Sequence, residues 1–378
     1  MIQKRTLPTA TCEWCPREDA AELQAFIDVH WRKGHVLARD RALLQWQFPG
    51  EQAGYLNVLV ARDEQGIAGI LGVIPFPFCH EGNMERGAWL SMWVVRKELQ
   101  SSGIGLHLLQ HVLKSNYACV GTLGGNGTTM RILGALRFHC KESLPRWILP
   151  GSPSALESLA KAAPPDVGAA MLEFAKQCKN IPSPRAESAS KLQVNPWNEQ
   201  NATGWNEAWN SRFAPRNIGV WRDADYVHHR YASHPSFQYQ IRVVRENQQV
   251  RGLLVYRVID IRDRSEKVVR VLEWMVEPGF AGLLLGELTD AVGAPNVAFA
   301  DFYCTDPAVG QELSAVGFQL EGKSAQAFPS RFQPLDFRKA GLTGAWWCSP
   351  AVASDSRAFF DHSLTYFTSA DCDQDRPN

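Results

Sequence analysis

The feature that most constrains the fold is an order of predicted elements that occurs twice along the chain. Each half reads as a β-hairpin, a third strand, a helix, a short strand and a second helix, followed closely by an aromatic residue. The third strand ends at Val95 in the first half and at Val276 in the second. The closing aromatic residues are Phe138 and Phe318, and their separation matches that of the two strand ends to within a single position. Separations that agree this closely predict a tandem duplication of one α/β unit.

The length of 378 residues amounts to about two to three ordinary domains, so two lobes are expected instead of one core. The first domain is predicted over 1–150 and the second over 201–378. Between them, Ala, Pro, Ser and Lys dominate 151–200, which is typical of a linker with one or two surface helices. A helix is also predicted over 18–31, where apolar residues recur at helical spacing. The repeated elements are strands at 55–61, 66–74, 87–95, 119–123, 237–244, 250–259, 268–276 and 297–302 and helices at 103–114, 128–136, 282–292 and 307–316.

A glycine-containing loop joins the strand that ends at Val95 to the helix that follows it. The loop has the sequence QSSGIG over residues 100–105. Glycines let the backbone curl, so several N–H groups converge at a helix N-terminus, where the macrodipole favours an anion such as a pyrophosphate. The loop is a poor dinucleotide fingerprint, because Leu108 replaces the third glycine, and it is no Walker loop, because no Gly-Lys-Ser or Gly-Lys-Thr follows. A tight strand-to-helix connection would explain the same residues without a ligand.

The segment VRKELQSSGIG, from Val95 to Gly105, resembles the acyl-CoA-binding motif of the GNAT N-acyltransferases. In that family a strand ending in Val leads into Arg/Gln-x-x-Gly-x-Gly/Ala. Asn126, followed by the helical and aromatic run RILGALRF, is similar to the family's next strand-to-helix segment. The resemblance covers roughly residues 55–140. It implies an α/β fold of two tandem GNAT-like lobes, each with a mixed sheet flanked by helices.

The resemblance also implies that a CoA thioester lies between two diverging strands of the first domain. A backbone N–H at Val95 would hold the oxyanion formed on the thioester carbonyl, and positioning of the amine beside that carbonyl would supply much of the rate. Many family members place a Tyr ahead of the terminal aromatic residue to protonate the departing thiolate, but Leu133 stands near the matching position here. The residues implied to bind acyl-CoA are Trp93, Val94, Val95, Gln100, Ser101, Ser102, Gly103, Ile104, Gly105, Leu106 and Asn126.

Two flanking segments resemble a subgroup of tandem GNAT-like proteins from surface-polysaccharide (O-antigen, lipopolysaccharide) pathways, in which a dTDP-linked amino sugar is N-acylated. One is the lead-in H-x-L-x-x-D-x-x-L-x-x-W-Q-F over 35–48, and the other is the tail DCDQDRPN over 371–378. The second half lacks the glycine loop after Val276, so it is implied to bind no CoA and to supply the acceptor site. The residues implied to bind the nucleotide sugar are His30, Asp40, Trp46, Glu273, Asp373, Asp375, Arg376 and Asn378.

A general base is needed, because the amine of an amino sugar is mostly protonated at neutral pH. His35 is the candidate, because it lies in the lead-in segment and histidine titrates in this range. His30 is a second candidate, and Glu273 and Asp40 are alternatives. An ordinary structural role is left open for His35, and the acidic tail is alternatively a frayed terminus.

Charge and composition argue against several other classes of protein. Lys plus Arg and Asp plus Glu number 39 each, so the chain lacks the positive excess that nucleic-acid binding needs. No apolar run approaches the roughly 18–20 residues that span a bilayer. The N-terminus lacks the apolar stretch of a signal peptide, so a cytoplasmic protein without membrane contact is expected. The single C-x-x-C, Cys12 and Cys15, has no second close pair, so no metal site is expected.

The sequence therefore predicts an acyl-CoA-dependent N-acyltransferase that acylates the amino group of a nucleotide-linked, dTDP-type amino deoxysugar by direct attack on the thioester. The alternatives are a GNAT enzyme for a peptide, antibiotic or polyamine, a non-catalytic module that binds CoA or a nucleotide, and a transferase that uses aminoacyl-tRNA. A polyamine site needs an acidic cleft, whereas a diphosphate sugar needs cationic and aromatic groups. The chain offers such groups in Arg32, Lys33, Arg39, Arg41 and Trp46. The oligomeric state is left open.

Overall fold

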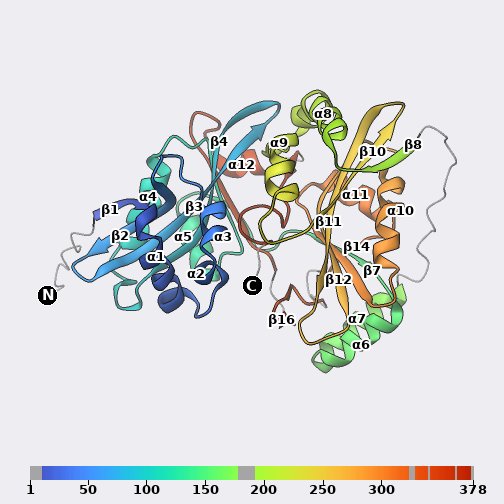
Figure 1. Ribbon diagram of the computed structural model, residues 1–378, viewed down its shortest axis with the longest axis horizontal. Coiled ribbons are helices and arrows are strands. Elements are labelled where there is room, and N and C mark those ends of the chain that lie inside the picture. The colour runs from blue at the N-terminus through green and yellow to red at the C-terminus, as the bar shows by residue number, and fades with distance from the viewer. Residues whose placement is uncertain (1–10, 178–191, 323–327, 339–340, 362–363, 376–378) are drawn as a thin grey trace.

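The computed structural model describes residues 11–177, 192–322, 328–338, 341–361 and 364–375. In this part of the chain two lobes lie side by side, each built on a large twisted sheet with helices on its faces (Figure 1). The expected α/β fold of two tandem mixed-sheet lobes is confirmed. No helix within these ranges combines the length and the apolar character needed to cross a membrane.

The sheet of the first lobe is mixed, with a parallel pair of strands near its centre. Its strands are β1 Thr11–Pro16, β2 Tyr55–Asp63, β3 Gly66–His80, β4 Asn83–Val95, β5 Cys119–Leu123, β6 His139–Lys141, β9 Ile218–Val220, β17 Gly344–Cys348 and β18 Thr365–Tyr366. They follow the order β1-β2-β3-β4-β5-β17-β6, and β9 pairs with β3 and β18. The central pair β4–β5 is parallel, whereas β2–β3 and β3–β4 are antiparallel.

Helices cover both faces of this sheet, because successive strand residues point to opposite sides. These helices are α1 Ala20–Phe26, α2 Val36–Arg39, α3 Arg41–Gln47, α4 Ile104–Lys114 and α5 Gly127–Ala135, with α12 Ser356–Phe360 beside β17 and β6. Helices α1, α2 and α3 pack on the face that carries Val60. Helices α4 and α5 pack on the opposite face, which carries Leu59.

The second lobe repeats this plan on a sheet of its own. Its strands are β7 Arg146–Pro150, β8 Leu192–Pro196, β10 Gln240–Glu246, β11 Gln249–Asp260, β12 Lys267–Val276, β13 Val297–Tyr303 and β14 Gln319–Leu320, in the order β14-β7-β13-β12-β11-β10-β8. Its helices are α6 Pro153–Ala162, α7 Pro165–Gln177, α8 Glu199–Ala208, α9 Ala224–Val227, α10 Ala281–Val292 and α11 Pro307–Ala315. Strands β15 Arg331–Phe332 and β16 Leu335–Asp336 form a small separate hairpin.

The two lobes exchange one strand each. Strand β7, which follows the first lobe in sequence, pairs with β13 and β14 of the second sheet. Strand β17, near the C-terminus, pairs with β5 and β6 of the first sheet. The predicted division at residue 150 therefore does not follow the sheets. Neither β7 nor β17 was among the predicted strands, and a local hydrophobic pattern does not identify the partner of a strand. The stretch 151–200, expected as a linker, also contributes to the second lobe: α6 packs in its core and β8 pairs with β10.

Equivalent elements of the two lobes keep the spacing seen in the sequence. Strand β4 ends at Val95 and β12 ends at Val276. Asn126 caps α5 through its side-chain oxygen, and Asp306 caps α11 in the same way. These two caps have the same separation along the chain as Phe138 and Phe318. The repeat read from the sequence is thus the repeating unit of the fold.

We expect a fragment that ends at residue 150 not to fold. It lacks β17, so one edge of β5 is left unpaired, and its β7 has no partner strand. Thermal melting followed by circular dichroism checks this, with the full chain, which should melt cooperatively, as the control. A cooperative transition in the isolated fragment would show that the exchanged strand is dispensable for folding.

Candidate functional site

Strands β4 and β5 of the first lobe start as a parallel pair and then diverge. Their pairing covers Gly87 to Trp89 on β4, whereas β4 continues to Val95. Just beyond the paired part the register between β3 and β4 shifts, and Met92 takes a φ of +50°. This bulge turns the backbone of β4 at the point where β5 leaves it. We call this point the first splay.

The predicted glycine loop follows β4 and opens α4. Gly103 has a φ of +89° and is the last residue before the helix, a backbone conformation that glycine adopts without strain. Among the described residues, the backbone N–H groups of Gly103, Gly105 and Leu106 have no hydrogen-bond acceptor. The Trp93 indole N–H donates to the Gly105 carbonyl over 3.0 Å, and a Cβ on Gly105 would lie 3.1 Å from that indole nitrogen. The loop therefore presents bare N–H groups at a helix N-terminus, which suits a phosphate.

The residues that the resemblance assigns to acyl-CoA lie on three elements around the first splay. Trp93, Val94 and Val95 end β4, residues 100–106 form the loop and the start of α4, and Asn126 follows β5. Asn126 Oδ1 accepts hydrogen bonds of 3.0 Å from the first N–H groups of α5. Leu133, near the position where many GNAT enzymes have a tyrosine, is fully buried in the core.

The C-terminal tail, residues 364–375, returns to this splay. Asp373 Oδ2 accepts a hydrogen bond of 2.5 Å from the Ser91 hydroxyl on β4. The Gln374 amide donates to the Leu123 carbonyl at the end of β5 over 3.0 Å. The tail is therefore attached to both strands where they diverge.

The same tail closes the corresponding point of the second lobe. Arg222, fully buried, donates to Glu273 on β12 over 2.8 Å and to both carboxylate oxygens of Asp371 in the tail over 2.8 and 2.9 Å. The Tyr366 hydroxyl donates to Glu273 over 3.0 Å and accepts from the backbone N–H of Trp274 over 3.0 Å. Burial, only partly offset by Arg222, raises the pKa of both carboxyl groups. These side chains fill the point in the second lobe where β12 continues to Val276 beyond its pairing with β13, which covers Lys267 to Arg270. We call this point the second splay.

Asp375 anchors the tail further along the second lobe. It accepts from the Arg257 guanidinium over 2.6 Å and from the Tyr239 hydroxyl over 2.8 Å. Burial alone would raise the pKa of Asp375, but Arg257 and Arg230 together hold it below its ordinary value. This carboxylate stays charged and keeps its arginine partner.

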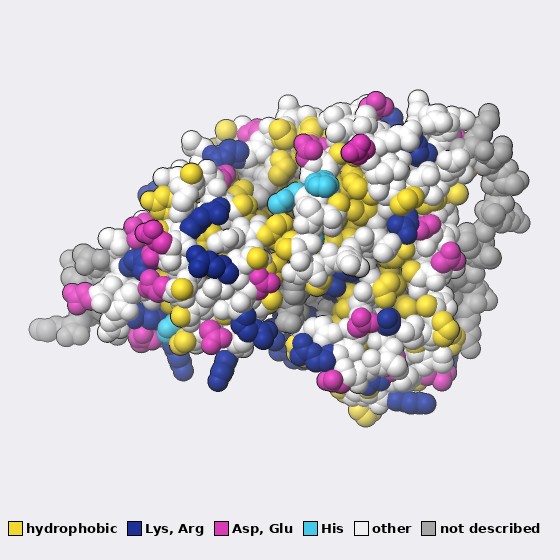
Figure 2. Space-filling model, viewed as in Figure 1, with side chains coloured by type: hydrophobic (Ala, Val, Ile, Leu, Met, Phe, Trp, Pro, Cys, Tyr) yellow, Lys and Arg dark blue, Asp and Glu magenta, His cyan; other side chains and the backbone are white. Residues whose placement is uncertain are grey.

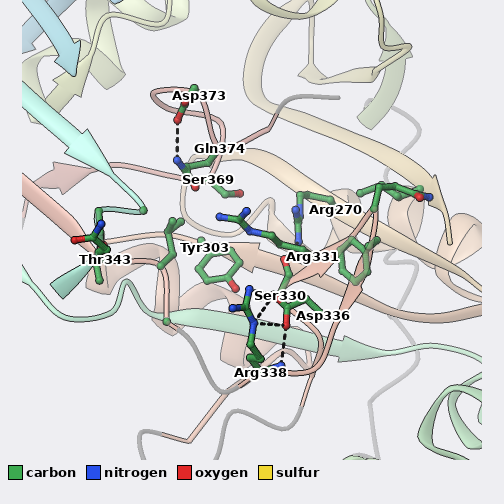
Figure 3. Close-up of a pocket in the computed structure, with 18 of the residues that line it drawn as sticks. Arg270, Tyr303, Ser330, Arg331, Asp336, Arg338, Thr343, Ser369, Asp373 and Gln374 are labelled. Carbon is green, nitrogen blue, oxygen red and sulfur yellow. Dashed lines mark hydrogen bonds and ion pairs between the residues drawn. The ribbon is translucent and has the colours of Figure 1, made fainter. Parts of the chain in front are cut away.

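Three hollows lie along the junction of the lobes. The first, the interlobe cavity, has a volume of about 580 Å³ and is lined from both lobes and the tail. Arg270, Arg331 and Tyr303 lie on one side of it, and the tail residues Ser369 and Gln374 lie on the other (Figure 3). Its polar and charged lining suits a polar ligand.

The second hollow, the aromatic cavity, has a volume of about 330 Å³. Trp46 from α3 stacks on His229 with ring centroids 5.5 Å apart and meets His234 edge-on at 4.3 Å. Burial and the Arg230 charge lower the pKa of His234 to about 3 and also lower that of His229, so both rings are neutral at pH 7. Histidine side chains lie among hydrophobic ones near the junction of the lobes in Figure 2.

The third hollow, the cationic pocket, is small, about 120 Å³. It is lined by Arg32, Lys33 and Arg39 from the first lobe and by Arg262 from the second. None of these four side chains forms an ion pair with another described residue, and Lys and Arg side chains gather along this edge of the junction in Figure 2. Gln333 lines both this pocket and the interlobe cavity, so the two adjoin.

The structure separates the residues that were expected to form the acceptor site. Trp46, Asp373 and Asp375 line the aromatic cavity together. Glu273 lies in the filled second splay, while Arg376 and Asn378 fall outside the described residues.

The lead-in residues lie elsewhere. His35 is buried and its Nδ1 accepts from a backbone N–H of α2, so it caps that helix at the edge of the cationic pocket. Asp40 caps α3 in the same manner. His30 is exposed and its ring packs on that of Phe26 at 4.7 Å. None of His30, His35 and Asp40 lines the interlobe or the aromatic cavity.

Ser91 and Arg222 are site residues that the sequence did not point out. Ser91 had one weak signal, since it is the polar residue within the apolar strand GAWLSMWVV. Arg222 lies in the segment IGVWRDADY, and nothing in that pattern indicates which carboxylates it would bind. Their roles are visible only in the structure, where both contact the C-terminal tail.

Comparison with solved structures identifies the fold of this chain. No family model and no curated protein matches the chain. A GCN5-related N-acetyltransferase from Anabaena variabilis is similar with a TM-score of 0.57 and 12% identity over 89% of this chain and 71% of that chain. A conserved protein of unknown function from Enterococcus faecalis, described as a probable N-acyltransferase, gives 0.56 and 9% over 89% and 72%. A GCN5-related N-acetyltransferase from Kribbella flavida gives 0.55 and 11% over 91% and 72%. At these identities the likeness shows the fold, which is that of the GCN5-related N-acetyltransferases.

We expect Arg222→Met to lower the free energy of unfolding by about 3–5 kcal/mol, because it leaves two buried carboxylates without their cation. Without Arg222 the folded-state pKa values of Glu273 and Asp371 rise further above their unfolded values. The unfolded chain then releases these protons at a lower pH than the folded chain does. The folded state is therefore increasingly destabilised as the pH rises from the unfolded-state pKa toward the folded-state pKa. The loss measured by urea denaturation should therefore be larger at pH 8 than at pH 5. Arg338→Met, at an exposed ion pair, is the control and should change little. An equal loss at both pH values would argue against a charged network.

Proposed function

We propose that this chain is an acyl-CoA-dependent N-acyltransferase that acylates the amine of a nucleotide-linked amino sugar. The observation that carries the proposal is the difference between the two splays. The first is followed by a loop of bare N–H groups, whereas Tyr366 and Glu273 fill the second. This asymmetry supports one thioester site per chain, in the first lobe.

The loop supports CoA as the donor. A left-handed glycine at 103 and the missing Cβ at Gly105 let backbone N–H groups approach a pyrophosphate closely. A CoA thioester supplies an activated acyl carbon. A β4 backbone N–H near Val95 would stabilise the charge that develops on the thioester oxygen as the amine attacks. The GCN5-related proteins from Anabaena variabilis and Kribbella flavida are N-acetyltransferases with this fold, which adds support for the reaction class.

The hollows at the junction support a nucleotide sugar as the acceptor. Four cations surround the cationic pocket, and guanidinium groups bind phosphate oxygens strongly. The adjoining interlobe cavity, with about 580 Å³, has room for sugar and base rings. A diphosphate in the pocket would thus extend its sugar toward the tail and the first splay.

One observation favours a second kind of acceptor. The aromatic cavity carries carboxylates from α9 and its start, Asp223 and Asp225, beside the rings of Trp221 and Tyr226. Aromatic faces and carboxylates together suit a free cationic amine such as a polyamine. The two acceptors differ in charge, so binding measurements separate them.

The proposal is tested first by thermal shift with CoA, acetyl-CoA, dTDP, UDP and spermidine added separately. A ligand at about 100 times its Kd contributes about 2.7 kcal/mol, which raises the melting temperature by a few degrees in a chain of this size. Shifts with CoA and with dTDP or UDP are expected. A shift with spermidine in place of the nucleotides would move the acceptor to the polyamine class, and no shift with CoA would overturn the donor assignment.

We expect Gly103→Trp to abolish CoA binding, because the side chain fills the loop and the residue must keep a left-handed backbone. Gly279→Trp is the matched control. Gly279 has a φ of +92° in the connection before α10 of the second lobe and has open space around it. Isothermal titration with CoA should lose its signal in the first variant and keep it in the second. Retained affinity in Gly103→Trp would mean that the loop is only a turn.

We expect Arg262→Ala to weaken dTDP binding about tenfold, the size of one lost charge-assisted hydrogen bond. The affinity for CoA should stay unchanged, and the effect should shrink at high salt. Arg264→Ala, two residues away in an ion pair with Glu266, is the control and should bind dTDP normally. If Arg262→Ala weakens CoA instead, the cationic pocket serves the donor's phosphates.

A further inference from the structure

We propose that Asp373 is the general base that takes a proton from the acceptor amine. This inference rests on the proposed function and assigns a catalytic residue to it. It replaces His35 in that role with a carboxylate from the C-terminal tail.

Asp373 lies between two of the cavities. Among the described residues, Asp373 alone lines both the interlobe cavity and the aromatic cavity. A transfer reaction needs its two substrates to meet at one point. A side chain shared by two hollows at the end of β4 and β5 stands at such a point.

Hydrogen bonds attach Asp373 to the first splay. The Ser91 hydroxyl donates to Asp373 Oδ2 over 2.5 Å, and the Gln374 amide donates to Oδ1 over 2.8 Å. Asp373 is 8% exposed, so its carboxylate is largely held by protein. Ser91 lies two residues beyond Trp89, where the pairing of β4 with β5 ends. These contacts hold the carboxylate at the first splay, beside Ser91, which lies four residues before Val95 on the same strand.

The path of the tail directs neighbouring carboxylates to different lobes. Cys372 takes a φ of +59°, an uncommon conformation for this residue type that turns the chain between its neighbours. Asp371 consequently bonds Arg222 in the second lobe, while Asp373 bonds Ser91 in the first. A strained residue that aims one side chain at a splay is a frequent feature of functional sites.

Other groups near the cavities are less suited to the role. Asp371 and Asp375 line the aromatic cavity but not the interlobe cavity. His234 accepts two backbone hydrogen bonds at Nδ1, and its lowered pKa makes it a weak base at neutral pH. The pKa of His229 is lowered as well.

The Asp373 carboxylate removes one proton from the ammonium group, and the amine lone pair then forms a C–N bond to the thioester carbonyl carbon. The C–S bond breaks as the tetrahedral intermediate collapses, and the second nitrogen proton goes to the departing thiolate. The products are the amide and CoA thiol, and Asp373 releases its proton to solvent.

The test compares wild type with Asp373→Asn in acyl transfer from acetyl-CoA to a panel of dTDP- and UDP-linked 3-amino and 4-amino 6-deoxysugars, followed by CoA thiol release. At pH 7 we expect kcat to fall about a hundredfold or more, with KM values within about threefold. The defect should shrink as the pH is raised to 9.5, because the amine is then neutral without help. Asp290→Asn, the same change at an exposed carboxylate on α10 that lines none of the three cavities, is the control and should keep wild-type kcat.

Two further variants guard against a merely structural effect. Asp373→Glu keeps a carboxylate and should recover part of kcat with the wild-type pH profile. Ser91→Ala removes the hydrogen bond that orients Asp373, and we expect a loss of roughly tenfold with unchanged CoA affinity.

Different results would overturn the role of Asp373 and the proposed acceptor. Wild-type turnover that persists in Asp373→Asn at pH 7, or a defect that does not change with pH, would overturn the role of Asp373 and leave the transferase intact. Absence of transfer by the wild-type protein to every sugar of the panel would overturn the nucleotide-sugar acceptor and the assignment together.

Discussion

The arrangement of this molecule depends on one buried guanidinium. Arg222 is fully buried and binds a carboxylate from β12, Glu273, and a carboxylate from the tail, Asp371. A buried charge without a partner is very unfavourable, so Arg222 requires both the strand and the tail to be in place. Its Nη1 also donates to the Val220 carbonyl on β9, which pairs with β3 of the first sheet. One side chain therefore connects the tail to both lobes.

This network explains how a duplicated unit comes to have two different splays. In the second lobe the Tyr366 hydroxyl bonds the backbone N–H of Trp274, which lies two positions before the end of its strand, as Trp93 does in the first lobe. The position that the resemblance gives to the substrate in one lobe is thus taken by the chain itself in the other. The filled second splay forms part of the core and supports the tail, so only the first splay is left for the proposed thioester. After such a duplication, one copy can keep the proposed substrate site while the other copy, with its splay filled, stabilises the fold.

The sequence predicts the repeated part of the fold well, because periodicity and turn residues are local signals. The helix that starts near Gly103 and the strand that ends at Val95 fall where the pattern places them. Strands β7 and β17 were not among the predicted strands, and a local pattern carries no information about which strand pairs with which, so their exchange could not be predicted. The candidate loop was visible for the same local reason, but the contact between Ser91 and Asp373 joins residues 282 positions apart. His35 was predicted as the base from the titration range of histidine, whereas its place as a helix cap outside the interlobe and aromatic cavities depends on the fold.

The same long-range contacts link the completion of the fold to the proposed chemistry. Strand β17 enters the first sheet, β18 pairs with β9, and the tail then passes between the lobes to reach β4. Each step uses a partner formed by a distant part of the chain, so Asp373 reaches the first splay only after both sheets are assembled. A chain whose tail is not docked would keep the glycine loop at the end of β4 but would lack the proposed base. Acyl transfer would then be confined to molecules whose last residues are docked, which places the control of activity in the fold itself.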